Sequence, residues 1–179
     1  MTSPLTDRRA EFVNYLHRLH YGLESDEAWR LAEARRDLAR LRRYFSGPRQ
    51  EAEAFAVVFA HDPPPREERV WVLLGALFAA HRYPYRMPPS GSWRPTLGAS
   101  MRQLKNNRGD SVDRRFIQLV SVDEAALPYY LYQAVQLLRA DRIPIDYRRL
   151  FDDLLRLFGG DDDMAQSARL AWSRDYNRP

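Results

Sequence analysis

The amino-acid sequence predicts an all-α protein of roughly nine helices in two small packed helical bundles. Through most of the 179 residues, apolar side chains recur every three or four positions, which is the spacing of one face of a helix. No stretch shows the sustained alternation of apolar and polar residues that is typical of a half-buried strand. Proline and glycine interrupt the helical pattern and divide it into segments of ordinary helix length.

Four helices are expected in the first half of the chain. The first lies at about 6–21, and Asp26 begins the second, which stops at Gly47. The apolar stripe of the second helix consists of Leu31, Ala34, Leu38, Leu41 and Phe45. The third, at about 49–61, ends at three consecutive prolines. The fourth, at 67–81, is mostly apolar, so we expect it at the centre of a core.

A proline-rich stretch separates the two halves. Residues 82–95 form the longest irregular segment and contain four prolines, a composition that favours a linker. We therefore divide the chain into an N-terminal helical bundle at 1–95, which ends in this linker, and a C-terminal helical bundle at 96–179.

Five helices are expected in the second half, at about 96–106, 111–121, 123–139, 146–158 and 161–176. Ser111 and Asp146 are residue types that cap helix N-termini. The aspartates at 161–163 place negative charge at a helix N-terminus, where the helix dipole favours it. Pro128 lies inside the first turns of the helix that Asp123 begins, which argues mildly against that start.

The composition excludes several classes of function. The chain has no cysteines, which excludes disulfide frameworks, thiolate zinc sites and cysteine nucleophiles. No apolar run is long enough to cross a bilayer, and the N-terminus lacks the layout of a signal peptide, so we expect a cytoplasmic protein without a membrane partner. Phosphate loops, nucleophile elbows and paired metal-ligand motifs are also missing, which predicts a non-catalytic protein without a cofactor. A metal-dependent enzyme using His17 and His20 remains an alternative.

Arginine supplies almost all of the positive charge. The formal net charge is +4, the isoelectric point is near 9.6, and Lys105 is the only lysine. An arginine excess is typical of phosphate recognition, because guanidinium groups bind phosphate oxygens bidentately and stack on bases. It is also typical of a GC-rich genome, whose codons favour arginine, and composition alone favours this second explanation, so the positions of the arginines have to decide.

One basic group lies on the second predicted helix. On a helical wheel Arg36, Arg40 and Arg43 lie opposite the apolar stripe and form an outward basic column. Glu33 and Asp37 stand at helical spacing and can neutralise part of this column. The column is therefore either a nucleic-acid contact or an ordinary solvated helix face.

The densest basic cluster without acidic compensation lies between residues 102 and 115. Its cations are Arg102, Lys105, Arg108, Arg114 and Arg115. They span a helix, a glycine-containing turn and the start of another helix, where backbone amides and arginines together suit phosphate binding. Arg115 has a second interpretation as a structural salt-bridge partner, because it lies beside the apolar face of Phe116 and Leu119.

The predicted helix at 123–139 offers a third surface. The side opposite its core face carries Tyr129, Tyr132, Gln136 and Arg139. Exposed tyrosines beside an arginine can stack unpaired bases. The same residue types are enriched in protein interfaces, so both interpretations stay open.

An ordered set of motifs covers most of the chain from residue 36 to 176. It comprises the arginine- and leucine-rich segment 36–43, then Leu97-Gly98, Asp113-Arg114-Arg115-Phe116, Leu127-Pro128, Leu137-Leu138-Arg139, Ile143-Pro144-Ile145-Asp146-Tyr147 and Ala171-Trp172-Ser173-Arg174-Asp175-Tyr176. On this set the chain resembles the CasB family, the small subunits of the type I-E CRISPR Cascade complex.

The resemblance implies a two-part helical protein without catalytic activity, present in Cascade as a dimer. Its implied partners are the backbone and large subunits, a second copy of itself, the guide RNA and the single-stranded non-target DNA. The basic positions carried over are Arg36, Arg40, Arg43, Arg114, Arg115 and Arg139. Where family members often have arginines, this chain has Ala99, Tyr132 and Gln133. The DNA path is therefore either shifted or served by Arg102 and Lys105.

These inferences lead to one functional hypothesis and one alternative. The chain is expected to bind nucleic acid without sequence preference, stabilising the guide RNA–target assembly and the displaced strand of the R-loop. The residues expected to bind nucleic acid are Arg36, Arg40, Arg43, Arg102, Lys105, Arg108, Arg114, Arg115 and Arg139. The alternative is a helical scaffold or interaction subunit that uses its arginines only for protein contacts.

Overall fold

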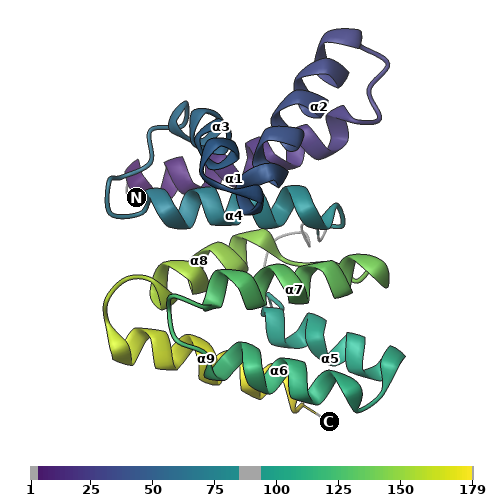
Figure 1. Ribbon diagram of the computed structural model, residues 1–179, viewed down its shortest axis with the longest axis vertical. Helices are drawn as coiled ribbons and strands as arrows, with labels where there is room; N and C mark the ends of the chain where they lie inside the picture. Colours follow the sequence, from purple (N-terminus) through teal and green to yellow (C-terminus); the bar gives the residue numbers. More distant parts are fainter. Residues whose placement is uncertain (1–3, 85–93, 179) are drawn as a thin grey trace. The chain divides into compact units, whose positions relative to one another are not determined.

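The computed structural model describes residues 4–84 and 94–178 (Figure 1). Within these two stretches the chain forms nine α-helices and one short 3₁₀-helix, and no strand. An isolated bridge joins Pro84 and Ile145. The predicted all-α fold class is confirmed.

The chain divides into two compact units, Met1–Arg82 and Tyr83–Pro179. Most of the proline-rich stretch that we interpret as a linker, at 85–93, lies outside the described residues. The backbone amide of Ile145 donates a hydrogen bond to the carbonyl of Tyr83 (3.3 Å). This bond and the neighbouring bridge attach Tyr83 and Pro84 to the second unit. The division into two bundles at residue 95 stays a prediction.

The first unit is a bundle of four α-helices. These are α1 (Pro4–Gly22), α2 (Ala28–Arg42), α3 (Pro48–Phe59) and α4 (Glu68–His81), and the 3₁₀-helix η1 (Arg43–Ser46) follows α2. Helix α2 packs against α1, α3 and α4. The core includes Phe12, Leu16, Leu41, Trp71, Leu74 and Phe78. All residues of α4 from 70 to 81 are buried, as the apolar sequence predicted.

The second unit contains α5 (Leu97–Arg108), α6 (Ser111–Ser121), α7 (Leu127–Ala140), α8 (Tyr147–Leu157) and α9 (Asp162–Tyr176). Helix α9 packs against α5, α6 and α8, and α6 packs against both α5 and α7 (Figure 1). The largest buried side chains of this unit are Leu97, Met101, Tyr147, Phe151 and Trp172. The unit therefore has an apolar core of its own.

Two of the predicted N-terminal caps are confirmed, a third is wrong although its helix begins at the predicted position, and one helix begins later than predicted. The carboxylates of Asp146 and Asp161 cap α8 and α9, each accepting a backbone hydrogen bond of 3.0 Å. Ser111 does not cap α6, because it is the first helical residue and its hydroxyl donates to the carbonyl of Arg108. Helix α7 begins at Leu127 rather than at Asp123, since Pro128 then lies in the first turn, where no amide hydrogen is needed.

The described helices include none that is both long enough and apolar enough to cross a membrane.

Candidate nucleic-acid interface

The basic column on α2 and η1 is exposed, but ion pairs within the chain compensate much of its charge. The Arg36 Nε lies 2.7 Å from a carboxylate oxygen of Asp37, and Arg40 lies 3.8 Å from the same oxygen. Arg43 reaches Glu53 on α3 at 3.4 Å. We expected Asp37 to neutralise part of the column, and it does so for both Arg36 and Arg40.

Asp37 is buried, which the helical wheel does not show. The hydroxyl of Tyr15 on α1 donates a hydrogen bond to its carboxylate at 2.9 Å. Burial opposes ionisation of Asp37, but the hydrogen bonds from Arg36 and Tyr15 outweigh it and lower the pKa of the carboxyl below its ordinary value. Arg36 and Arg40 thus share one buried carboxylate, and the three residues together carry a single net positive charge.

The cluster between residues 102 and 115 is only partly uncompensated, which corrects the sequence-based expectation. The Lys105 ammonium lies 2.8 Å from Asp113. The Arg108 guanidinium forms an ion pair with Asp141, at the C-terminal end of α7. Arg102 donates a hydrogen bond to the carbonyl of Arg178 at 3.3 Å. Helix α6 thus brings a carboxylate to Lys105, and the end of α7 brings one to Arg108.

Arg114 and Arg115 differ from the other cations of this cluster. Both are exposed, and neither has an ion pair with an acidic group in the described part of the chain. No acidic residue within 4–84 and 94–178 forms a salt bridge with Arg115. Its interpretation as a structural salt-bridge partner is therefore wrong with respect to these residues. These two guanidinium groups keep their full donor capacity for an external anion.

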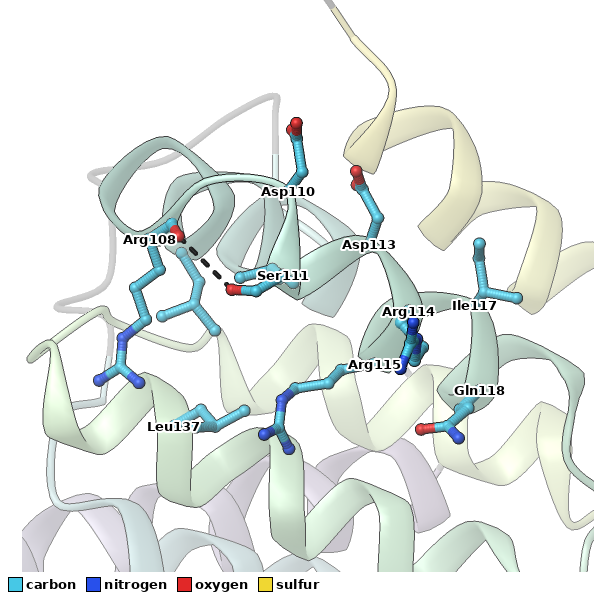
Figure 2. A pocket seen from close by; sticks show the side chains of 11 residues that line it. Arg108, Asp110, Ser111, Asp113, Arg114, Arg115, Ile117, Gln118 and Leu137 are labelled. Atoms are coloured by element: carbon cyan, nitrogen blue, oxygen red, sulfur yellow. Dashed lines mark hydrogen bonds between the residues drawn. The ribbon is translucent and has the colours of Figure 1, made fainter.

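Arg108, Arg114 and Arg115 line an open groove with a volume of about 910 Å³. In Figure 2, Arg108 and Arg115 lie on the same side of α6, above Leu137 of α7, whereas Asp110 and Asp113 point to the opposite side. The turn and the α6 helix thus separate the acidic groups from the basic groups. The side that faces α7 is predominantly basic and therefore suits a polyanion.

A smaller hollow of about 220 Å³ adjoins this groove, because Arg115, Gln118 and Leu137 line both. It is further lined by Tyr129, Tyr130, Gln133 and Ala134. Tyr129 is 60% exposed.

The remaining predicted positions on α7 and α5 are less accessible. Arg139, Tyr132 and Gln136 are each half-buried, so the side of α7 opposite its core is only partly solvated. The chain departs from the CasB pattern at Ala99, Tyr132 and Gln133. Ala99 is buried, and Tyr132 and Gln133 are half-buried.

The two histidines considered as metal ligands lie against an aromatic ring. The rings of His17 and His20 are 5.5 Å and 6.5 Å from that of Phe78. Across the described stretches, no group of three or more histidine, aspartate or glutamate side chains is placed to hold a metal ion. Packing on the core explains this histidine pair.

Sequence reasoning missed an aromatic surface between α1 and α2. Trp29 is 62% exposed, and the guanidinium of Arg30 lies 5.2 Å from the centre of its ring. Tyr15 and Tyr21 line the same hollow, which has a volume of about 560 Å³. The available signal was a tryptophan next to an arginine near the start of the second helix, outside its apolar stripe.

The segment 171–176 has a structural role that its motif did not reveal. The indole of Trp172 donates a hydrogen bond to Asp153 (2.7 Å), and Asp175 accepts one from the hydroxyl of Thr96 (2.8 Å). The Tyr176 hydroxyl donates to Asp113 (2.6 Å). Burial is the main cause that raises the pKa of Asp153, although Arg149, one turn earlier on α8, forms an ion pair with it at 3.2 Å. These buried polar pairs fix α9 against the rest of its unit.

Fold and groove together define a class: an all-α protein of two helical units with an arginine-lined surface. A sequence model of the CRISPR-associated protein Cse2 family matches residues 37–176. The chain belongs to this family. The CRISPR-associated protein Cse2 of Thermus thermophilus is 36% identical over 66 residues, a match that spans 37% of this chain and 35% of that relative's length.

Solved structures share the fold over nearly the whole chain. CasB from Thermobifida fusca has a TM-score of 0.66 and 26% identity, covering 97% of this chain and 96% of that one. CasB from Thermus thermophilus gives the same TM-score and identity, with 98% of both chains covered. A chain of a CRISPR RNA-guided surveillance complex also has this fold, with a TM-score of 0.69, 23% identity, and coverage of 96% and 95%. The resemblance to CasB proteins is confirmed.

Proposed function

We propose that this chain is the small subunit of a type I-E CRISPR Cascade complex, and that it binds nucleic acid without sequence preference and without catalysing a reaction. Membership of the Cse2 family supports the place in Cascade. The observation that carries nucleic-acid binding is the pair of exposed arginines, Arg114 and Arg115, which line the groove beside α6. Guanidinium groups free of internal carboxylates are suited to phosphate oxygens.

The proposed role is to hold a strand, not to read its sequence. R-loop formation exchanges one duplex for another of similar stability, so modest contacts to the displaced non-target strand or to the guide RNA–target assembly can tip the balance. Contacts to phosphates act on any sequence, because the backbone is the same throughout. The backbone and large subunits of Cascade, and a second copy of this chain, are the proposed protein partners.

The test is a double substitution, Arg114→Ala with Arg115→Ala, in a reconstituted Cascade complex. R-loops should dissociate faster than with the unmodified chain. For single-stranded DNA, the slope of log affinity against log salt concentration should fall by about 1.4, since each phosphate contact contributes roughly 0.7. The matched control is Arg49→Ala with Arg66→Ala, which removes the same charge from exposed arginines of the first unit. An R-loop lifetime equal to that of the control would contradict the proposal.

A second candidate function is a helical scaffold whose arginines contact only protein. Five of the nine basic residues, Arg36, Arg40, Arg43, Lys105 and Arg108, form ion pairs inside the chain, which favours this role for them. Photo-crosslinking in the assembled complex separates the candidates. The scaffold predicts crosslinks to protein subunits and none to DNA at Arg114 and Arg115, with an interface that is insensitive to salt.

A further inference from the structure

The groove between α6 and α7 continues beyond its arginines to an exposed aromatic ring. The larger hollow begins at Arg108 and the smaller one ends at Tyr129 and Tyr130. Arg115 and Gln118 line both hollows, so one continuous surface presents guanidinium groups at one end and tyrosine rings at the other. Figure 2 shows the arginine end, with Arg115 above Leu137 of α7.

The charge of this surface favours a polyanion. Arg114 and Arg115 have no carboxylate partner among the described residues. Of the two acidic residues in the lining, Asp113 already accepts hydrogen bonds from Lys105 and Tyr176, on the other side of α6. An acidic ligand therefore meets two unpaired cations without displacing an internal ion pair.

The end of the groove that Tyr129 and Tyr130 line favours a ligand with a flat, apolar ring. Tyr129 lies in the first turn of α7 and is 60% exposed. Its ring meets that of Tyr130 edge to face, with centroids 5.4 Å apart and planes at 89°, so these two rings do not stack on each other. An aromatic ring held on a helix and left in water loses little conformational entropy when a second flat ring covers it.

A single strand of nucleic acid carries both chemistries next to each other, because each phosphate is followed by a base. We propose that Tyr129 is a stacking platform for one unpaired base, while Arg115 binds a neighbouring phosphate. Gln118 and Gln133 line the same hollow as Arg115 and Tyr129, and side-chain amides, which both donate and accept, can hydrogen-bond base edges of any identity. This inference rests on the proposed nucleic-acid binding and specifies its ligand as single-stranded, since a duplex does not expose a base face.

The experiment compares two oligonucleotides that have the same number of phosphates. One is oligo(dT), and the other is its fully abasic counterpart, which carries the charge without the bases. Affinities of the full-length chain are measured by fluorescence anisotropy at several salt concentrations. The unmodified chain should prefer oligo(dT) by roughly 5- to 150-fold, the range expected for stacking of one base.

Substitutions then separate stacking from charge. Tyr129→Ala should remove most of this preference and leave the affinity for the abasic strand unchanged, whereas Tyr129→Phe should retain it. Arg115→Ala should weaken binding of both strands equally and reduce the salt slope by about 0.7. Tyr21→Ala is the matched control, because it removes an exposed tyrosine from the first unit.

Each other outcome overturns the inference in a distinguishable way. If Tyr129→Ala leaves oligo(dT) binding unchanged, or weakens both strands equally, the ring does not stack on a base and this inference alone fails. If oligo-glutamate displaces oligo(dT) in a manner that depends on Tyr129, the groove binds an acidic protein segment instead. If the unmodified chain binds neither oligonucleotide, the inference fails together with nucleic-acid binding by the isolated subunit, while the R-loop test of Arg114 and Arg115 still judges the subunit inside Cascade.

Discussion

The buried carboxylate of Asp37 reduces the positive charge that the basic face of α2 presents to a ligand. It accepts hydrogen bonds from Tyr15 on α1 and from Arg36 on α2, and it lies 3.8 Å from Arg40. A buried polar group that loses its partners is costly, because the desolvation of the group is no longer offset. Asp37 thus ties α1 to α2 and directs two of the three column arginines toward the protein.

Replacement of Asp37 by asparagine should lower the free energy of unfolding by about 1 to 3 kcal/mol, the range for a buried hydrogen-bonding group whose bonds are no longer fully satisfied, because a neutral amide cannot replace both carboxylate acceptors. Urea denaturation at neutral pH measures this change. Glu33→Gln is the control, because Glu33 lies on the same helix and forms no ion pair within the described chain. A D37N variant as stable as the unmodified chain would contradict the structural role of this carboxylate.

The same carboxylate makes stability depend on pH. Burial works against it, but hydrogen bonds from Arg36 and Tyr15 hold the pKa of folded Asp37 below its unfolded value of about 3.9. Its contribution is therefore fully present above that unfolded value and is lost as the pH falls through the lower folded pKa. The stability difference between the unmodified chain and D37N should shrink as the pH falls below about 4, and a difference as large at pH 2 as at pH 7 would contradict this assignment.

At the scale of elements, the contact between α5 and α9 is set by Gly98. A Cβ atom at this position would lie 1.9 Å from the carbonyl oxygen of Trp172, so the backbones of the two helices approach as closely as only glycine permits. Beside it, the Thr96 hydroxyl donates to Asp175. The Leu-Gly motif at 97–98 and the segment 171–176 are therefore two sides of one packing contact.

Gly98→Ala should destabilise the second unit by more than about 3 kcal/mol, because the new methyl group meets rigid backbone and the helices have to separate. Gly75→Ala is the matched control. There the nearest atom is the Cδ2 of Leu41 at 3.0 Å, the end of a side chain that can move, and alanine is the better helix former by roughly 1 kcal/mol. Thermal denaturation of both variants should show a large loss for the first and a small change for the second; equal effects would contradict the proposed close contact.

The α6 helix explains why only part of the basic cluster is available to a ligand. Asp113 lies on the side that faces α9, where Lys105 and Tyr176 contact it. Arg115 lies on the side that faces α7, beside Gln118 and Leu137 (Figure 2). An amphipathic helix with an acidic edge and a basic edge thus separates structural charges from free ones.

At the scale of the whole molecule, the chain consists of two units that each have a buried core. In the second unit, α9 packs on α5, α6 and α8, and the buried pair of Thr96 and Asp175 joins residues 79 positions apart in the sequence. A domain of this size buries enough apolar surface to fold by itself. The arginine groove lies wholly within this unit.

A fragment of residues 83–179 should therefore fold on its own into a helical bundle. Circular dichroism should show high helix content, and urea should unfold the fragment in one cooperative transition. A fragment of residues 96–179 provides the comparison. It lacks Tyr83 and Pro84, which contact Ile145, so it should unfold at lower urea concentration. Non-cooperative unfolding of the longer fragment would contradict the independence of the second bundle.

The sequence by itself determined the class of fold, most helix positions and the family. Apolar spacing placed Ala34 and Leu41 on a buried stripe and α4 in a core, and the residue types at 146 and 161 identified two helix caps. These features depend on neighbours within one or two helical turns, and such neighbours are readable from the order of residues.

Only the tertiary structure decided which basic side chains have no ion pair within the described chain. Arg108 pairs with Asp141 across 33 positions, whereas Arg114 and Arg115, which follow two acidic residues in the sequence, have no such partner in the described chain. It also decided that Asp37 is buried beside Tyr15 and that Tyr129 stands exposed at the end of an arginine groove. The physical reason is that charges and rings interact through space, so their partners depend on how helices pack and not on spacing along one helix.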